Sequence, residues 1–261
     1  MTEAVFTDPV VITRPAAQAG ALAARIAARG REAVVFPLLE IHPLADQAPL
    51  LAALAELEQY ALVAFVSPNA IGAAFAARPD WPATVPLAVM GEGSRQALAE
   101  LGITSATTAI TSPQDKHRTD SQTLLAELDL AALKGKKALI LRGESGRELL
   151  ADALRAAGVE VTTVAAYRRL APLLDQPRRE RLLALLAGRH EWIITSSEAL
   201  RYLLRMVEQV GGAQGLANLQ AQKFIIPHAR ILETAQNAGL SRLVLTGSGD
   251  EHMLAALQSH P

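Results

Sequence analysis

Two stretches of the chain, residues 10–37 and 138–165, carry the same pattern with the same internal spacing. Each begins with a strand-like run ending in arginine, continues through a segment rich in alanine and leucine that closes at a glycine, and then becomes strand-like again. The matching positions lie 128 residues apart in the chain: Arg14 and Arg142 for the arginine, Gly30 and Gly158 for the glycine. Strand, helix and strand in this order are typical of a βαβ unit, so the pattern predicts an internal duplication.

A longer pattern repeats in the same sense. Residues 62–67 are echoed by residues 192–196, and residues 87–91 are echoed by residues 224–228. Along the chain, a piece with one strand–helix unit is therefore followed by a piece with three such units, and this arrangement occurs twice. Because βαβ units build parallel sheets with helices on their faces, we expect an α/β fold with two similar parallel-sheet, flavodoxin-like domains that arose by duplication.

The domain boundaries follow from where the repeated units must go, because a one-unit piece cannot form a sheet alone. The second one-unit piece completes the three-unit piece next to it, which predicts an inserted domain over residues 44–164. The first one-unit piece must then pair with the end of the chain, which gives a discontinuous domain of residues 1–36 and 173–261. The linkers, residues 37–43 and 165–172, are bounded by proline or extended in character, and we expect them to run side by side as a hinge.

Two further stretches have the composition of surface loops. Residues Thr111 to Thr119 are rich in serine, threonine, proline and charge, and residues Gly211 to Gly215 are rich in glycine. Segments of this kind usually connect regular elements at the surface, so we expect a loop at each.

Composition narrows the functional class. Half of the 261 residues are apolar and 20% are charged, which is enough material for two cores. The formal net charge of -1 argues against general binding of nucleic acid. No cysteine is present, which excludes disulfides and thiolate chemistry, and no apolar run has the length of a membrane span or secretory signal. We therefore expect a cytoplasmic protein with no membrane or nucleic-acid partner.

Known catalytic and nucleotide-binding motifs are missing. The run Gly91-Glu92-Gly93 begins like a dinucleotide loop but has Gln96 where the third glycine belongs. A zinc-protease helix would need a second histidine at Ile194, and the six histidines are scattered, so no metal site is expected. The run of residues 143–146 misplaces the second glycine of a hydrolase nucleophile elbow.

The ends of the predicted strands carry the candidate ligand-binding residues, because ligands of parallel α/β sheets gather beyond the carboxyl ends of the strands. These positions are Arg14, Ser67, Gly91, Arg142, Ser196, His228 and Thr246, with Asn69, Gly93 and Ser197 in the same turns. Hydroxyls, glycines and guanidinium groups beside helix N-termini suit an anionic ligand. Ser67, Asn69, Ser196 and Ser197 are expected to act first as helix N-caps and second as ligand contacts.

Several of these segments together resemble the uroporphyrinogen-III synthase family, over almost the whole chain. The segments that carry the resemblance are residues 10–15 (Val-Val-Ile-Thr-Arg-Pro), 65–70 (Phe-Val-Ser-Pro-Asn-Ala), 89–94 (Val-Met-Gly-Glu-Gly-Ser) and 166–168 (Ala-Tyr-Arg). The chain departs from the family pattern at residues 227–230, Pro-His-Ala-Arg, where the family often has a glycine-containing turn before a threonine.

The resemblance implies a cofactor-independent lyase of tetrapyrrole and heme biosynthesis. Such an enzyme cyclises the linear tetrapyrrole hydroxymethylbilane to uroporphyrinogen III with inversion of ring D. The substrate is reactive enough to cyclise unaided to the symmetric isomer I, so the enzyme must chiefly position it. The resemblance also implies a polycarboxylate substrate bound in a cleft between the domains, a monomer, and hydroxymethylbilane synthase as a transient partner.

Tyr167 matches the tyrosine that the family carries in its second crossing. There, the resemblance implies, a phenol donates a hydrogen bond to the departing hydroxyl of the bilane. The alternative is that Tyr167 packs in the hinge with its hydroxyl satisfied by backbone. Arg14 and Arg142 have two interpretations as well, since each either binds substrate carboxylates or pairs with a carboxylate of a nearby helix.

Two other functions fit the same layout. A non-enzymatic two-lobed binder or sensor would hold a small anionic ligand between its lobes and turn nothing over. The missing export signal, and the absence of a helix-turn-helix or basic arm, weigh against the transport and regulator forms of such a protein. A methyltransferase acting on tetrapyrroles is the weaker possibility, because the third glycine of the nucleotide loop is missing.

Overall fold

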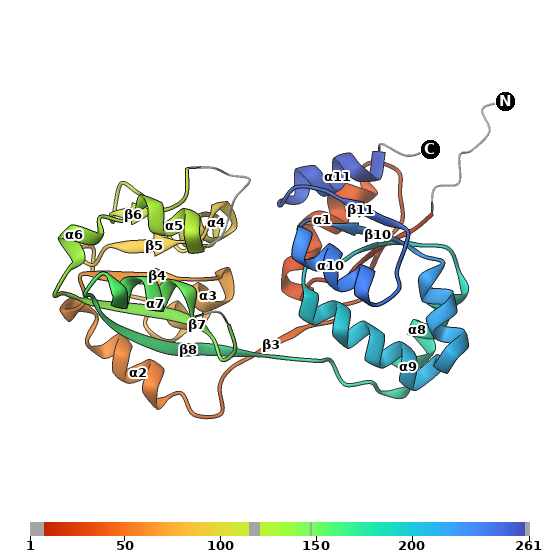
Figure 1. Cartoon of the computed structure of the whole chain (residues 1–261), viewed down its shortest axis with the longest axis horizontal. Helices are drawn as coiled ribbons and strands as arrows, with labels where there is room; N and C mark the ends of the chain where they lie inside the picture. The colour runs from red at the N-terminus through yellow and green to blue at the C-terminus, as the bar shows by residue number, and fades with distance from the viewer. Residues whose placement is uncertain (1–7, 115–120, 147, 259–261) are drawn as a thin grey trace. The chain divides into compact units, whose positions relative to one another are not determined.

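The computed structural model describes residues 8–114, 121–146 and 148–258 and divides the chain into two compact units (Figure 1). Unit 1 consists of Met1–Glu40 and Leu170–Pro261, and unit 2 consists of Ile41–Arg169. The expected domains, residues 1–36 with 173–261 and residues 44–164, lie inside these units.

Unit 1 is built on a five-stranded sheet in which every pair of neighbouring strands is parallel. In sheet order, its strands are β11 (Leu243–Leu245), β10 (Lys223–Ile226), β9 (Glu191–Ile193), β1 (Val10–Ile12) and β2 (Ala33–Val35). The central strands are apolar on both faces, since all three residues of β1 are fully buried. Strands of this kind require cover on both sides of the sheet.

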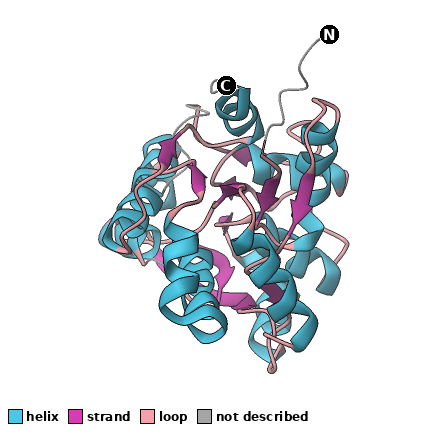
Figure 2. Ribbon diagram, turned by 90° about the vertical axis from the view of Figure 1, so that its right-hand side faces the viewer, coloured by secondary structure: helices cyan, strands magenta, loops and turns pink. Residues whose placement is uncertain are grey.

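Helices supply that cover, and they surround the strands in Figure 2. One face of the unit 1 sheet shares a core with α1 (Ala16–Ala27) and α11 (Asp250–Gln258). The other face shares a core with α8 (Gln176–Ala187), α9 (Ser197–Gln220) and α10 (Ala229–Asn237). The helices therefore lie on both faces of the sheet, as in a doubly wound α/β fold.

Unit 2 contains a six-stranded sheet. In sheet order, its strands are β3 (Glu40–His42), β8 (Glu160–Leu170), β7 (Lys137–Gly143), β4 (Leu62–Phe65), β5 (Leu87–Val89) and β6 (Ile110–Thr111). The strands from β8 to β6 are all paired in parallel.

Residues of β4 alternate between the two cores of unit 2, with Val63 and Phe65 in one and Leu62 and Ala64 in the other. The first core also contains α2 (Ala48–Ala55), the 3-10 turn η1 (Leu57–Gln59), α3 (Pro68–Ala77) and α4 (Glu92–Glu100). The second contains α5 (Ser121–Glu127), α6 (Leu130–Leu133) and α7 (Leu149–Ala156). Unit 2 thus has the same three layers as unit 1.

The expected α/β class and the expected duplication are confirmed. The order β2, β1, β9, β10, β11 in unit 1 corresponds to β8, β7, β4, β5, β6 in unit 2. The register of the first pair is also kept, because Val10 lies opposite Ala33 and Ala138 lies opposite Val161, each 128 residues further on. Among the strands of the described residues, β3 alone has no counterpart in the other sheet.

Each of the two expected linkers contains strand residues in the structure. Strand β3 lies within the linker of residues 37–43. Strand β8 runs from residue 160 to residue 170 and so extends into the linker of residues 165–172. These two strands are hydrogen-bonded neighbours in the unit 2 sheet.

The loop expected at residues 211–215 is reduced to a break at one residue. Two helical segments of α9 meet at Gly212, where the backbone is not helical, with φ of 51° and ψ of -140°. Gly215 in the second segment lies close to Val207 in the first, since a Cβ there would approach the Val207 carbonyl oxygen to 3.2 Å. The glycines serve to fold one helical segment onto the next. Of the other expected loop, Thr111 ends β6, and residues 115–119 lie outside the described part of the chain.

Within the described part of the chain, no helix is both long enough and apolar enough to cross a membrane.

The glycines that close the duplicated helices adopt left-handed backbone conformations, with φ of 75° at Gly30 and 81° at Gly158. We predict that Gly30→Ala lowers the free energy of unfolding by about 1 kcal/mol, because an alanine at positive φ brings Cβ close to the following carbonyl oxygen. Apart from its own chain neighbours, no atom lies within 4 Å of the added methyl group, so backbone strain is the expected cause of the loss. Urea denaturation measures it.

The matched control is Gly20→Ala, which lies on the exposed side of the same helix and also has open space around it. Its backbone is helical, so alanine should raise the free energy of unfolding by roughly 0.5–1 kcal/mol. Equal shifts in both variants would contradict the assignment of Gly30 as the residue that ends the helix.

Candidate functional site

The predicted site residues form one set in each unit, because the carboxyl ends of parallel strands meet at one edge of a sheet. Unit 1 carries Arg14, Ser196, Ser197 and His228. Unit 2 carries Ser67, Asn69, Gly91, Gly93, Arg142 and Tyr167. The expected cleft between the domains stays a prediction.

Tyr167 and Ser67 are brought together at the edge of the unit 2 sheet. The Tyr167 side chain is 3% exposed, and its hydroxyl oxygen accepts a hydrogen bond from Ser67 Oγ at 3.1 Å. Ser67 is the N-cap of α3, and its Oγ accepts the backbone N–H of Ala70 at 3.2 Å. In this arrangement the hydroxyl hydrogen of Tyr167 remains available to donate to another acceptor.

A β-bulge sets the position of Tyr167. Arg142 on β7 lies opposite Ala165 and Gly143 lies opposite Tyr167, so Ala166 is the extra residue on β8. Because of this insertion, Ala166 and Tyr167 both belong to the same core instead of alternating across the sheet. The Glu144 N–H donates to the Tyr167 carbonyl oxygen at 2.8 Å, which holds the backbone after the bulge.

The two arginines are equivalent in the duplication and are both held by carboxylates. Arg14 Nη1 lies 2.7 Å from Asp250 Oδ1 in the first turn of α11. Arg142 Nη2 lies 2.5 Å from Glu148 Oε1, at the N-cap position of α7. Both arginines thus pair with helix carboxylates, and their binding of substrate carboxylates stays a prediction. Both arginine side chains are less than one-fifth exposed, at 18% and 17%.

The serines at the strand ends have different roles. Ser196 is the N-cap of α9 and accepts the N–H groups of Glu198 at 3.2 Å and Ala199 at 3.4 Å, so the capping role predicted for it and for Ser67 is confirmed. The same prediction is wrong for Ser197 and Asn69, which lie inside the first turns of α9 and α3. Ser197 is 7% exposed, and its hydroxyl is hydrogen-bonded to that of Thr234 at 3.2 Å, so it faces α10.

His228 is the N-cap of α10. Its Nδ1 accepts the Arg230 N–H at 3.3 Å. The side chain is otherwise exposed at the edge of the unit 1 sheet.

The glycines Gly91 and Gly93 lie at the start of α4. Gly91 is the N-cap and offers no side chain to the first turn. A Cβ at Gly93 would lie 4.0 Å from Pro68 Cγ, which is ordinary van der Waals contact, so packing alone does not demand a glycine there. The same contact shows that the N-termini of α3 and α4 are neighbours. Two adjacent helix N-termini present unpaired N–H groups and partial positive charge to an anion.

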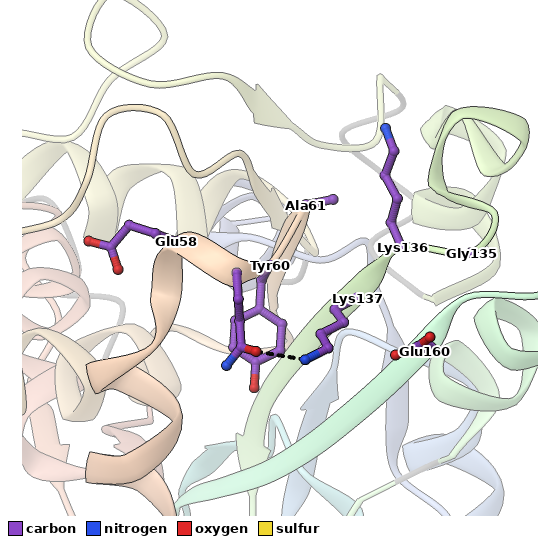
Figure 3. Close-up of a pocket in the computed structure, with 8 residues that line it drawn as sticks. Glu58, Tyr60, Ala61, Gly135, Lys136, Lys137 and Glu160 are labelled. Atoms are coloured by element: carbon purple, nitrogen blue, oxygen red, sulfur yellow. Dashed lines mark hydrogen bonds between the residues drawn. The ribbon is translucent and has the colours of Figure 1, made fainter.

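A surface pocket of about 430 Å³ lies at the opposite edge of the unit 2 sheet (Figure 3). It is lined by Glu58, Gln59, Tyr60, Ala61, Gly135, Lys136, Lys137 and Glu160, at the amino ends of β4, β7 and β8. The consecutive Lys136 and Lys137 point in opposite directions, and Lys137 Nζ donates to Gln59 Oε1 at 2.7 Å. From Glu160 to Tyr167 the strand extends about 23 Å at 3.3 Å per residue. With two lysines and two glutamates, the pocket offers no net positive charge to a polycarboxylate.

Among the described residues, no group of three or more histidine, cysteine, aspartate or glutamate side chains could hold a metal ion. The chemistry that the unit 2 edge offers includes the buried phenol of Tyr167, helix N-termini and the guanidinium group of Arg142. The sequence reasoning missed one residue at this edge, Gly143, whose only signal was a glycine at the end of a strand.

Comparison with known proteins identifies the family. A family model described as uroporphyrinogen-III synthase HemD matches residues 20–255. The uroporphyrinogen-III synthases of Salmonella typhimurium (strain LT2) and Escherichia coli (strain K12) are each 30% identical to this chain, over 95% of it and 99% of each relative.

Two crystal structures show a similar fold. Uroporphyrinogen-III synthetase from Helicobacter pylori 26695 matches with a TM-score of 0.62 at 13% identity, covering 97% of this chain and 99% of that one. A mutant uroporphyrinogen III synthase from the extremely thermophilic bacterium Thermus thermophilus matches with a TM-score of 0.55 at 16% identity, covering 96% of this chain and 97% of that one. Taken with the family model and the two relatives, these findings show that the chain belongs to the uroporphyrinogen-III synthase family.

Proposed function

We propose that this chain is a uroporphyrinogen-III synthase that cyclises hydroxymethylbilane to uroporphyrinogen III. Membership of the family over nearly the full chain and 30% identity to two synthases support this activity. The described residues also provide what such a reaction requires, namely a fixed proton donor and groups that bind anions.

Tyr167 is the proposed catalytic residue, and the observation that carries the proposal is its hydrogen bond with Ser67. The phenol donates a hydrogen bond to the hydroxyl that leaves the bilane, which assists the breaking of the carbon–oxygen bond. The hydroxyl departs as water, and the pyrrole that carried it loses its N–H proton to give the azafulvene. The resulting azafulvene is then attacked by the substituted carbon of ring D, and the spiro intermediate fragments and recloses with ring D inverted. Because Ser67 donates to the Tyr167 oxygen, it orients the phenol without occupying its proton.

The proposed substrate contacts are groups that bind carboxylates. In unit 2 these are the N–H groups of the first turns of α3 and α4, next to Ser67, Gly91 and Gly93, together with Arg142. In unit 1 the corresponding groups are Arg14, Ser196 and His228. Charge-assisted hydrogen bonds from guanidinium groups and helix N-termini are the usual way in which proteins bind such anions. Asn69 belongs to the proposal through its place in the first turn of α3, whereas the contact between Ser197 and Thr234 argues against a role for Ser197.

The proposal extends to the surroundings of the enzyme. The bilane cyclises unaided, so a monomer that takes it directly from hydroxymethylbilane synthase in the cytoplasm would limit its loss as isomer I. The absence of cysteine is compatible with a reducing compartment.

The activity is tested in a coupled assay. Hydroxymethylbilane synthase supplies the bilane, the purified chain is present or absent, and the oxidised products are separated chromatographically. We expect uroporphyrin III to predominate when the chain is present. Isomer I alone, formed at the rate seen without the chain, would overturn the proposal and leave the two-lobed ligand binder as the alternative.

Arg142 provides a second test. We predict that Arg142→Ala raises KM for the bilane by about tenfold with little change in kcat, because a lost carboxylate contact weakens ground state and transition state alike. Steady-state kinetics of isomer III formation measure both constants.

The matched control is Glu148→Gln, which removes the carboxylate partner of Arg142 but keeps the guanidinium group. This variant should keep KM at or below its original value. If Glu148→Gln raises KM as much as Arg142→Ala does, the ion pair matters only for structure and Arg142 does not bind substrate.

A further inference from the structure

We propose that Gly143 is a positioning residue for Tyr167: the missing side chain at the end of β7 lets the phenol ring lie against the strand and fixes the direction of its hydroxyl. The inference rests on the proposed function of Tyr167 and deepens it, because it identifies what holds the reactive group in place.

The contact between the two residues is close. A Cβ added to Gly143 would lie 3.1 Å from Tyr167 Cζ, 3.2 Å from its hydroxyl oxygen and 3.3 Å from Cε2. Favourable contacts between carbon atoms lie at about 3.5–4.0 Å, so a methyl group here would push on the ring. All three of the nearest atoms belong to the hydroxyl end of the ring, which is the end that carries the proposed chemistry.

The ring has little room to move without losing its alignment. Tyr167 is 3% exposed and packs in a core with the neighbouring Val164 and Ala166. Its backbone is held by the bulge and by the hydrogen bond from Glu144. Ser67, the hydrogen-bond partner of the hydroxyl, is fixed by its capping bond to Ala70. A side chain at residue 143 would therefore displace the hydroxyl relative to Ser67.

Backbone conformation does not explain the glycine at this position. Gly143 is the last residue of β7 and is not among the glycines with positive φ. An alanine could adopt the same backbone without strain. The Tyr167 ring supplies all of the three nearest atoms to the missing side chain, so the requirement for glycine comes from the phenol.

The consequence for the reaction follows from the position of the hydroxyl. If the phenol is displaced, its hydrogen bond to the departing hydroxyl lengthens and carbon–oxygen cleavage slows, while the unaided route to isomer I continues. Binding of the substrate carboxylates involves other groups. We therefore expect kcat and the fraction of isomer III to decrease, while KM stays unchanged.

The test compares Gly143→Ala with Gly72→Ala, an exposed position in α3 where no atom lies within 4 Å of the added methyl group. The protein is labelled with carbon-13 at the tyrosine Cζ, and its three tyrosines give three signals, of which that of Tyr167 is assigned by its loss in Tyr167→Phe. In Gly143→Ala we expect the Tyr167 signal to move, kcat to fall by about tenfold or more and KM to stay. Gly72→Ala should match the unmodified protein in all three.

A double variant separates positioning from general damage. In the Tyr167→Phe background, Gly143→Ala should lower kcat no further, because the hydroxyl that it displaces is already gone. In the Tyr167→Leu background, which lacks the three contacting atoms, Gly143→Ala should lower Tm much less than it does alone. This comparison holds even if the single Gly143→Ala variant does not fold, since the double variant must then fold.

Three results would overturn the proposal: an unmoved Tyr167 signal with unchanged kcat in folded Gly143→Ala, an equal further loss of kcat in the Tyr167→Phe background, or an equal loss of Tm in the Tyr167→Leu background. Failure of the proposed function is distinguishable, because the unmodified chain would then form no isomer III, whereas the carbon-13 signal and Tm would still report on the contact.

Discussion

The hydrogen bond between Tyr167 and Ser67 ties together the features on which the proposed chemistry depends. It joins the end of β8 to the first turn of α3, two segments separated by 100 residues in the chain. The bond forms only because β4, β7 and β8 are parallel and end at the same edge of one sheet. The bulge on β8 turns Tyr167 toward α3, and the missing side chain of Gly143 leaves room for the ring. Each of these features is ordinary, and their combination fixes one phenol with its proton available.

Comparison of the two duplicated units shows why unit 2 carries the phenol and unit 1 does not. Both units have the same strand order, the same register in the first strand pair and a serine N-cap at the equivalent strand end, Ser67 or Ser196. At the repeat offset of 128 residues, the counterpart of Tyr167 is Leu39 and the counterpart of Gly143 is Pro15. Leu39 is 6% exposed and belongs to the apolar core of unit 1. The shared architecture supplies anion-binding helix termini in both copies, whereas the phenol and its glycine support belong to unit 2.

Most of the secondary-structure elements and their order could be predicted from the sequence, because the patterns that indicate them are local or periodic. The glycines that end the helices, the serine caps and the repeat spacing each depend on a few neighbouring residues, and they predicted the elements and their order. The resemblance to the family added Tyr167. The bulge at Ala166 could not be predicted, since it depends on how β8 pairs with β7, and the requirement for Gly143 depends in turn on the bulge.

The remaining errors have the same physical origin. Ser197 looked like a second cap, but it lies one residue further along the chain, and its side chain therefore points toward Thr234. Residues 211–215 looked like a loop because glycine is common in loops, yet all but Gly212 continue the two helical segments of α9, and Gly215 in the second segment packs close to Val207 in the first. In both cases tertiary packing decided between two local structures that the sequence allows.

The central claim is that the Tyr167 hydroxyl assists departure of the bilane hydroxyl, and single-turnover kinetics of Tyr167→Phe test it most directly. With enzyme in excess over hydroxymethylbilane, the account predicts that the rate constant for forming isomer III falls by about 10²-fold, the lower range for loss of a general acid. Isomer I should rise in its place, while the circular dichroism spectrum and Tm stay close to those of the unmodified protein. An unchanged rate constant with an unchanged ratio of isomers would contradict the account and leave Tyr167 with a packing role alone.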